Sequence, residues 1–160
     1  MINKSLFTSD NQKWETPIEL FDKLNEVFDF KYDLAAEDIT AKCKNYYTPE
    51  DDAFNYTWDQ TSYLNPPYGR EQIKWIERAY EQSKKNGNTI VCLIPARPDT
   101  KIWHNVIFNY AKSICFIKGR LKFGGSKDSA PFPSALIIFS NNLTDKQIEL
   151  LGSLGKNFVM

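Results

Sequence analysis

The stretch Asn65-Pro66-Pro67-Tyr68 carries the side chains of this chain that are best suited to chemistry. The asparagine side-chain oxygen and the main-chain carbonyl that follows can together accept both hydrogens of an aromatic amine, which frees a lone pair that the ring otherwise delocalises. The two prolines stiffen the loop and have no N–H groups that compete as donors. Tyr68 offers a flat ring on which a base can stack. These residue types favour a site for a planar amine, and a rigid turn at the end of a strand is the alternative interpretation.

The segments around this loop alternate between helical and extended patterns. A helix is predicted to begin with Thr16 as N-cap, Pro17 at the first helical position and Glu19 closing a capping box. Thr144, with Gln147 three residues later, predicts a second start of this kind. Apolar periodicity predicts helices over 16–28, 70–86, 99–110 and 143–151, room for one more helix within 35–44, and strands over 30–34, 62–64, 89–94, 113–117 and 135–139.

Strands that alternate with helices indicate an α/β fold, with a mixed, mostly parallel sheet flanked by helices. Ligands of such sheets bind beyond the C-terminal ends of the strands. Asp33 and Asn65 both fall at the ends of predicted strands. We therefore expect the two residues to be neighbours in space, although they lie 32 positions apart in the chain.

The composition favours a globular unit without disulfides or a membrane span. Of the 160 residues, 42% are hydrophobic and 14% aromatic, which is enough to bury a core. No charged-then-apolar leader starts the chain, and no apolar run approaches the roughly 18 residues of a membrane span. Three separated cysteines suit a reducing compartment, and His104 has no partner at metal-ligand spacing. We expect a single domain over residues 1–160 that is soluble, cytoplasmic and free of metal, with no separate target-recognition domain.

The net charge of zero is a cancellation between two unlike halves of the chain. Residues 1–60 carry six Lys or Arg against 13 Asp or Glu, whereas residues 61–160 carry 14 against seven. The segment from Lys112 to Lys127 holds five basic residues and no acid, which suits a polyanion, although a solvated lysine face explains it too. The candidate contacts to a polyanion are Arg70, Arg97, Lys118, Arg120, Lys122 and Lys127.

Ordered sequence blocks over residues 14–139 resemble the motifs of phage-type DNA N6-adenine methyltransferases, the Dam-like phage family. So many blocks in order are far more specific than any one of them. The resemblance implies an abbreviated Rossmann-like fold and an activity that depends on S-adenosylmethionine. The blocks are Trp14-Glu15-Thr16-Pro17, Asp33-Leu34-Ala35-Ala36, Ala41-Lys42-Cys43, Tyr47-Thr48, Glu50-Asp51-Asp52, Trp58, Asn65-Pro66-Pro67-Tyr68-Gly69, Trp75, Ile94-Pro95-Ala96-Arg97-Pro98-Asp99-Thr100, Gly119-Arg120-Leu121-Lys122-Phe123 and Ala130-Pro131-Phe132-Pro133-Ser134.

The resemblance implies that Asn65-Pro66-Pro67-Tyr68 is the catalytic loop and that earlier blocks bind the cofactor. The Thr16-Pro17 block, with Trp14 beside it, would help to hold the methionine carboxylate of S-adenosylmethionine, for which a helix start is suited. Asp33 would accept from the ammonium group of the cofactor, and Ala35 would leave space for its close approach. The first motif of the wider superfamily is usually glycine-rich, and this chain has no glycine there.

Asp51 and Asp52 are candidates for a ribose contact. They lie 18 and 19 positions after Asp33, close to the roughly 20-residue offset at which dinucleotide folds place a ribose-binding acid. Only 12 residues separate Asp52 from Asn65, too few for a full helix and strand, so the middle of the fold must be abbreviated. The sequence leaves open which acid contacts ribose or adenine, with Phe54 as a candidate stacking face.

The expected reaction is a direct in-line transfer of the cofactor's methyl group to N6 of an adenine taken out of duplex DNA, without a metal or a covalent enzyme intermediate. The basic segment would contact DNA phosphates. Cytosine N4, an RNA adenine and a protein glutamine stay open as other substrates, and a catalytically silent nucleic-acid-binding module is the alternative from another class. Protection of phage DNA from restriction is the role that the family resemblance suggests; the sequence predicts neither a recognition site nor an oligomeric state.

Overall fold

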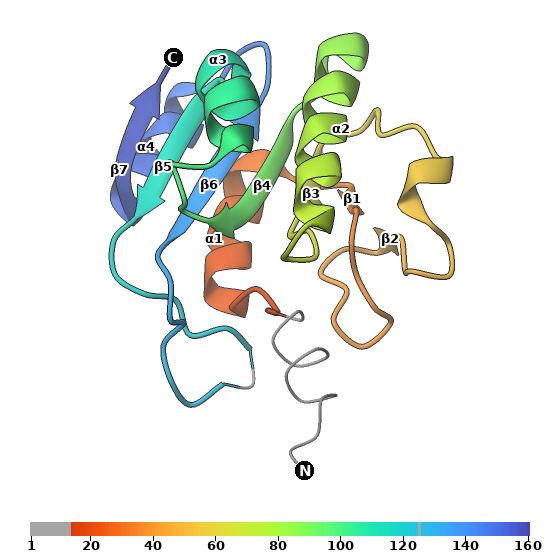
Figure 1. Cartoon of the computed structure of the whole chain (residues 1–160), viewed down its shortest axis with the longest axis horizontal. Helices are drawn as coiled ribbons and strands as arrows, with labels where there is room; N and C mark the ends of the chain where they lie inside the picture. The colour runs from red at the N-terminus through yellow and green to blue at the C-terminus, as the bar shows by residue number, and fades with distance from the viewer. Residues whose placement is uncertain (1–13, 125) are drawn as a thin grey trace.

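The computed structural model describes residues 14–124 and 126–160, and within them seven strands form one sheet in the order β2-β1-β3-β4-β6-β5-β7 (Figure 1). The predicted α/β architecture is confirmed, and the structure adds two strands, β2 and β7, that the sequence patterns did not predict. The strands are β1 (Tyr32–Asp33), β2 (Asn45–Tyr46), β3 (Ser62–Leu64), β4 (Ile90–Pro95), β5 (Ser113–Ile117), β6 (Ser134–Phe139) and β7 (Gly155–Val159).

Five of the seven strands of this sheet run in one direction. Strands β1, β2, β3 and β4 are paired in parallel. Strand β6 is antiparallel to both β4 and β5, so β5 runs in the direction of β4, and β7 is antiparallel to β5. The sheet is therefore mixed and mostly parallel in strand direction, as predicted. The C-terminal ends of β1, β3, β4 and β5 consequently lie at the same edge, where ligands of such sheets bind.

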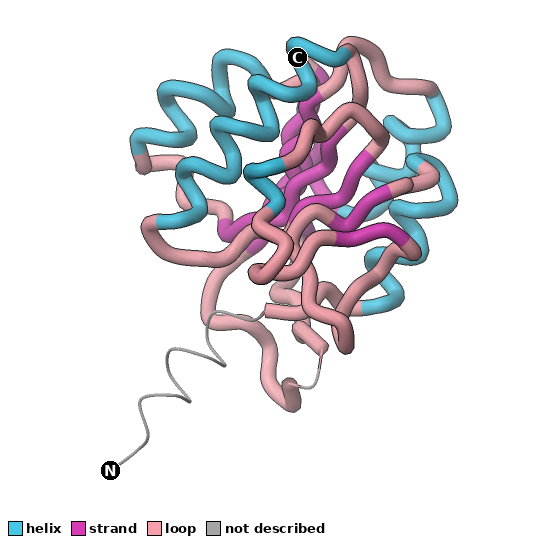
Figure 2. Tube along the Cα trace, turned by 90° about the vertical axis from the view of Figure 1, so that its right-hand side faces the viewer, coloured by secondary structure: helices cyan, strands magenta, loops and turns pink. Residues whose placement is uncertain are grey.

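Helices cover both faces of the sheet (Figure 2). Strand β4 shows why, because it is buried along its whole length and its residues alternate between two cores. Ile90, Cys92 and Ile94 pack in the core that includes residues of α2, whereas Val91 and Leu93 pack in the core that includes residues of α1 and α4. The helices are α1 (Ile18–Phe28), the 3-10 turn η2 (Ala53–Asn55), α2 (Glu71–Asn86), the π-helical turn η3 (Trp103–Ile107) with α3 (Phe108–Tyr110), and α4 (Asp145–Leu154).

The two predicted capping boxes have different outcomes. At α4 the box is confirmed, because the Thr144 side chain accepts from the Gln147 N–H and the Gln147 side chain accepts from the Thr144 N–H. At α1 the prediction is wrong: the N-cap is Pro17, and no side chain caps the helix. The Thr16 hydroxyl is buried and bonds the hydroxyl of Tyr63 instead. A tertiary hydrogen bond has therefore replaced the local one.

The segment between β1 and β2 does not form the helix for which the sequence left room. It makes a turn in which the N–H groups of Thr40 and Ala41 both donate to the carbonyl of Glu37. The chain then returns to the sheet as β2, which is parallel to β1. Within the described residues no helix is both long and apolar enough to cross a membrane.

Candidate active site

A cavity of about 350 Å³ lies where β1 and β3 end, within the size range of cofactor and small-ligand sites. The residues that follow these two strands form much of its wall. The two residues 14–15 before α1, the segment from the end of β2 into η2, and the start of α2 supply the rest. The residues that we predicted to bind a cofactor and that line this cavity are Trp14, Ala35, Asp52, Phe54 and Asn65. Two further residues of the predicted catalytic loop, Pro66 and Pro67, also line it.

The side-chain amide of Asn65 has a fixed orientation. Its Nδ2 atom donates to the main-chain carbonyl of Trp14 and, at 3.4 Å, to the hydroxyl of Thr16. The Oδ1 atom is buried and has no hydrogen-bond partner among the described residues. Because both amide hydrogens are engaged, the end of Asn65 that is left for a ligand is an acceptor. A buried acceptor without a partner is costly, which makes this atom a candidate ligand contact.

Tyr68 lies beside this cavity and packs into an aromatic cluster. Its ring stacks with Trp14 at a centroid distance of 6.3 Å and meets Phe132 edge-on at 5.6 Å. Phe123 completes the cluster through its contacts with Trp14 and Phe132. Burial raises the pKa of the Tyr68 hydroxyl, so this group stays protonated at neutral pH. One face of the ring is thus turned to Trp14, and a base would have to stack on the other.

Asp33 ends β1 as a buried carboxylate that is only partly satisfied. The residue is 4% exposed. Oδ2 accepts from the Lys42 N–H at 3.0 Å, whereas Oδ1 has no partner among the described residues. Burial raises the pKa of Asp33 to about 6, although the N–H groups of Lys42 and Ala35 and the Lys42 charge act against this rise. Asp33 is in register with Tyr63, two residues before Asn65, so the predicted proximity of these strand ends is confirmed.

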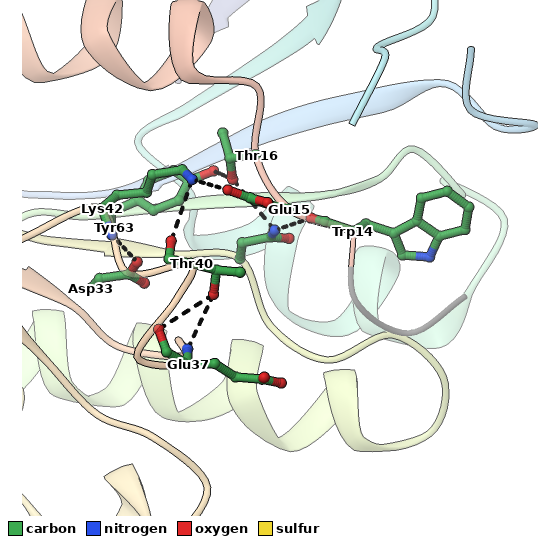
Figure 3. A network of polar contacts seen from close by, with 9 residues as sticks. Trp14, Glu15, Thr16, Asp33, Glu37, Thr40, Lys42 and Tyr63 are labelled. Carbon is green, nitrogen blue, oxygen red and sulfur yellow. Dashed lines mark hydrogen bonds and ion pairs between the residues drawn. The ribbon is translucent and has the colours of Figure 1, made fainter. Parts of the chain in front are cut away.

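Asp33 does not itself line the cavity, whereas the two alanines that follow Leu34 do. Glu15 also lines it and forms an ion pair with Lys42 at 2.6 Å, in which the Lys42 side chain is only 10% exposed (Figure 3). The sequence analysis placed Lys42 and Glu15 in family blocks but gave neither a role. The only sequence signal for this pair was those blocks, because 27 positions separate the two residues.

The structure separates the two neighbouring candidate acids. Asp51 accepts from the N–H and the hydroxyl of Thr48, at 2.9 and 3.0 Å, and does not line the cavity. Asp52 does line it, and its backbone has a φ of 55°, a left-handed conformation that aspartate tolerates better than most residues. Its side chain accepts from the N–H of Phe54 and so starts η2. Phe54 lines the same cavity, edge-on to Trp75 at 4.8 Å.

The remaining predicted cofactor residues, Thr16 and Pro17, lie outside the cavity wall. The Thr16 hydroxyl is 2.5 Å from the Tyr63 hydroxyl, and the Pro17 carbonyl accepts from the N–H of Phe21 in the first turn of α1. Sequence reasoning missed Tyr63 as a member of this site, because its contact with Thr16 spans 47 positions. It also missed two cavity residues on α2, Glu71 and Lys74, and it gave no role to a third, Trp75, which it had placed in a family block.

Comparison with known proteins places this arrangement in a family. A family model of DNA N-6-adenine-methyltransferases (Dam) matches residues 4–153. The chain belongs to this family. It is 31% identical over 140 residues to the DNA N-6-adenine-methyltransferase of Haemophilus phage HP1, an alignment that covers 82% of this chain and 80% of the relative. It is 36% identical over 64 residues to the putative methyltransferase YfdM of Escherichia coli K12, covering 35% of this chain and 70% of that protein.

The six basic residues predicted to contact DNA are all exposed in this methyltransferase. Arg70 follows the Asn65 loop and Arg97 follows β4, while the other four lie in the segment 118–133, which we call the basic loop, between β5 and β6. These three segments leave β3, β4 and β5 at the same edge of the sheet, and Figure 1 shows the basic loop below the sheet on the side where the chain enters α1. The topology therefore gathers the predicted DNA contacts at the edge that holds the cavity.

The basic loop is hydrogen-bonded to residues 14–16, the segment whose main chain and Thr16 hydroxyl bind the side-chain amide of Asn65. The Gly124 N–H donates to the carbonyl of Glu15 at 2.8 Å, and a Cβ atom at Gly124 would lie 2.9 Å from a Glu15 carboxylate oxygen. The other end of the loop is held by the Ala96 N–H, which donates to the Pro133 carbonyl at 2.8 Å. His104 is exposed and meets Phe108 edge-on, and no cluster of potential metal ligands occurs among the described residues.

Proposed function

We propose that this DNA N6-adenine methyltransferase takes its methyl group from S-adenosylmethionine and binds that cofactor in the cavity beyond β1 and β3. The volume of about 350 Å³ and the mixture of carboxylate, amide and aromatic walls support this assignment. Asp33 does not line the cavity but comes two residues before the wall residue Ala35, and its unpartnered, buried Oδ1 would accept from an ammonium group that extends past this wall. When bound, the cofactor supplies the electrophilic sulfonium methyl group, and the protein supplies orientation and charge.

Two acids of this chain would divide the polar contacts to the cofactor. Asp33 would accept from its ammonium group, and a cation beside the carboxylate would favour the ionised form of Asp33. Asp52 would accept from the ribose hydroxyls, because it lines the cavity while the Asp51 carboxylate is engaged with Thr48. Phe54 supplies an apolar wall for an adenine ring, and Ala35 leaves the backbone close to the ligand.

The Thr16-Pro17 block needs a narrower assignment than the family resemblance gave it. Thr16 is 3% exposed, and its hydroxyl already bonds Tyr63 and Asn65. We therefore assign the contact of this block with the methionine carboxylate to main-chain N–H groups at the start of α1, where the helix dipole favours an anion. Trp14 then serves as a wall of the cavity beside this carboxylate.

The target amine would meet Asn65 Oδ1 and the carbonyl of Pro66, which accept its two hydrogens. This pulls the nitrogen toward a tetrahedral geometry and turns its lone pair toward the methyl group. The face of the Tyr68 ring that is turned away from Trp14 would stack on the extruded adenine. No strong base is required, because the nitrogen loses a proton readily once it is cationic. The observation that carries this proposal is the orientation of Asn65, whose amide hydrogens are both engaged while Oδ1 has no partner among the described residues.

The test is to incubate the protein with methyl-labelled S-adenosylmethionine and with DNA, RNA of the same sequence, or protein, and then to identify the labelled nucleoside or residue. We expect N6-methyldeoxyadenosine from DNA. Label in N4-methylcytosine, in RNA alone or in protein alone would overturn the substrate assignment, and no label in any substrate would favour the silent binding module. We place the reaction in the cytoplasm of a bacterial or phage-infected cell, where this modification would protect DNA from restriction.

A further inference from the structure

A buried row of polar groups that the proposed chemistry does not use links Tyr63 through Thr16 to Asn65. Figure 3 shows Tyr63 and Thr16 of this row. The hydroxyl of Tyr63 is 2.5 Å from the hydroxyl of Thr16, and Thr16 Oγ1 accepts from Nδ2 of Asn65 at 3.4 Å. The second acceptor of that nitrogen is the carbonyl of Trp14. This row of hydrogen-bonded groups therefore extends from the core of the protein to the Asn65 amide at the cavity.

Tyr63 is the rigid end of this row of hydrogen-bonded groups. It is fully buried in β3, where its ring meets Phe21 edge-on at 5.3 Å and Phe30 at 5.5 Å. Asn65 is the first residue after β3, two positions beyond Tyr63. Burial raises the pKa of Tyr63 well above its usual value, so its hydroxyl stays neutral across the working range of pH.

These hydrogen bonds determine which end of the Asn65 amide faces a ligand. The two ends of an asparagine amide have nearly the same shape, so hydrogen bonds rather than packing select between them. Reversing the amide would turn Oδ1 toward the Trp14 carbonyl, which can only accept, and would offer an N–H group to an amine that itself needs acceptors. The Tyr63 hydroxyl can accept the Thr16 proton, and Thr16 Oγ1 then has only lone pairs to offer, which suits the Asn65 N–H and not Oδ1.

We propose that Tyr63 is a positioning residue for methyl transfer, which acts through Thr16 to hold the Asn65 amide with Oδ1 turned toward the target amine. This inference rests on the proposed role of Asn65. Tyr63 touches neither substrate nor cofactor. The same geometry assigns the Thr16 hydroxyl to the positioning of Asn65 and not to the binding of the cofactor.

The test compares Tyr63→Phe and Thr16→Val, which remove one hydroxyl each at almost constant volume. We expect kcat at saturating substrates to fall about 10-fold for each, because a reacting group loses its fixed geometry. The KM for S-adenosylmethionine should stay within about twofold of wild type, since the ground-state contacts of the cofactor remain. Thr16→Ser keeps the hydroxyl and should restore most of kcat. A rise in this KM on Thr16→Val without a fall in kcat would return the Thr16 hydroxyl to cofactor binding and overturn the proposal.

Ser113→Ala is the matched control. It also removes a buried hydroxyl that bonds another side chain, Asn157 Oδ1, but at the pairing of β5 and β7, remote from the Asn65 loop. A merely structural role of Tyr63 would lower the melting temperature and kcat of both variants alike. We expect similar thermal shifts and a fall in kcat only for Tyr63→Phe.

A double-mutant cycle separates this inference from the proposed function. In the Asn65→Ala background, Tyr63→Phe should have no further effect on kcat, because the group that it positions is gone. An additive further loss, or unchanged kcat for Tyr63→Phe in wild type, would overturn the positioning role and leave the function of Asn65 intact. If Asn65→Ala itself keeps more than half of wild-type turnover, the proposed function fails first, and the positioning proposal fails with it.

Discussion

The side-chain amide of Asn65 donates to the main-chain carbonyl of Trp14, which lies 51 positions earlier in the chain. The Trp14 ring in turn packs against Phe123 and Phe132 of the basic loop, at 5.4 and 5.3 Å. One residue therefore contacts both the acceptor at the cavity and the loop predicted to meet DNA. Its carbonyl is the part that Asn65 uses, so substitutions of the Trp14 side chain leave that hydrogen bond possible.

Asn65→Ala should reduce kcat by roughly 100- to 1,000-fold, the usual effect of removing one preorganised group that acts on the transition state. Cofactor affinity should fall much less, because the lost acceptor serves mainly the target amine. Single-turnover methylation together with calorimetric titration of S-adenosylmethionine measures both quantities. Asn109→Ala, an exposed asparagine of α3, is the control and should leave both unchanged. Retention of more than about half of wild-type turnover by Asn65→Ala contradicts the assignment of this loop.

Asp33→Asn should change the pH dependence of stability in a defined direction. The pKa of Asp33 is raised to about 6 in the folded protein from an ordinary value of 3.8, so the native state binds this proton more tightly than the unfolded state does. The contribution of Asp33 to stability is therefore complete below about pH 4 and is lost as the pH rises to about 6. We subtract the melting temperature of Asp33→Asn from that of wild type, both without cofactor. This difference should fall as the pH rises through this window and should level off above it. A flat difference would show that Asp33 titrates normally.

Cofactor binding should show the opposite trend with pH, because a cation binds the ionised carboxylate. The affinity of the wild-type protein for S-adenosylmethionine should rise as the pH increases through about 6, the pKa of Asp33. Asp33→Asn should bind the cofactor more weakly at pH 7 and lose this dependence, with DNA affinity nearly intact. Calorimetry from pH 5 to 7.5 makes the comparison. If Asp33→Asn instead weakens DNA binding and spares the cofactor, the pocket has been misplaced.

Asp52→Asn should weaken cofactor binding, while Asp51→Asn should not. The two acids are adjacent, but only Asp52 lines the cavity, and the Asp51 carboxylate closes a turn with Thr48. Loss of a charged acceptor to a ribose hydroxyl should cost on the order of 1.5 to 3 kcal/mol of binding energy. Asp51→Asn is the matched control, and titration of both variants with S-adenosylmethionine decides between them. Equal affinities, or a larger loss for Asp51→Asn, would reverse the assignment.

The sequence predicts the parts of this fold that depend on local patterns. Consecutive prolines mark the end of β3 and so locate Asn65, and the apolar run over 89–94 marks a strand buried on both faces. Strand β2 has only two residues and β7 is largely exposed, so neither leaves a clear pattern. The capping box at Thr16 fits the local rule as well as the one at Thr144 does. It fails because Tyr63, which the sequence does not connect to Thr16, offers the hydroxyl a buried partner.

In the candidate site, too, local sequence patterns predict some features, and tertiary contacts determine the others. The residue types of the Asn65 loop follow from the chemistry of an aromatic amine, whereas the orientation of its amide depends on Trp14 and Thr16, which the fold brings from another segment. The choice between Asp51 and Asp52 could not be made from their spacing to Asp33, because one position separates them. The backbone conformation of the turn makes this choice, because it directs Asp51 to Thr48 and places Asp52 on the cavity wall.

Neutralising Arg120 and Lys122 together should flatten the salt dependence of DNA binding. Both are exposed in the basic loop, which the N–H of Gly124 joins to the segment beside the cavity. Each phosphate contact releases counterions, so the slope of log affinity against log salt should fall by roughly one to two units for the Ala pair. Binding to all sequences should weaken about equally and cofactor binding should be unaffected.

The matched control for this prediction is the pair Lys84→Ala and Lys85→Ala, which removes the same charge from the C-terminal end of α2, at the opposite edge of the sheet from the loop. Its salt slope should stay that of wild type. If Arg120 reads guanine directly, its loss would also relax the preference for one position in a methylated pool of mixed sequence. If neither the slope nor the methylated-site pattern changes, the basic loop is a solvated surface. The DNA path must then follow Arg70 and Arg97, which leave β3 and β4 at the same edge, and the same salt titration of those two variants would locate it.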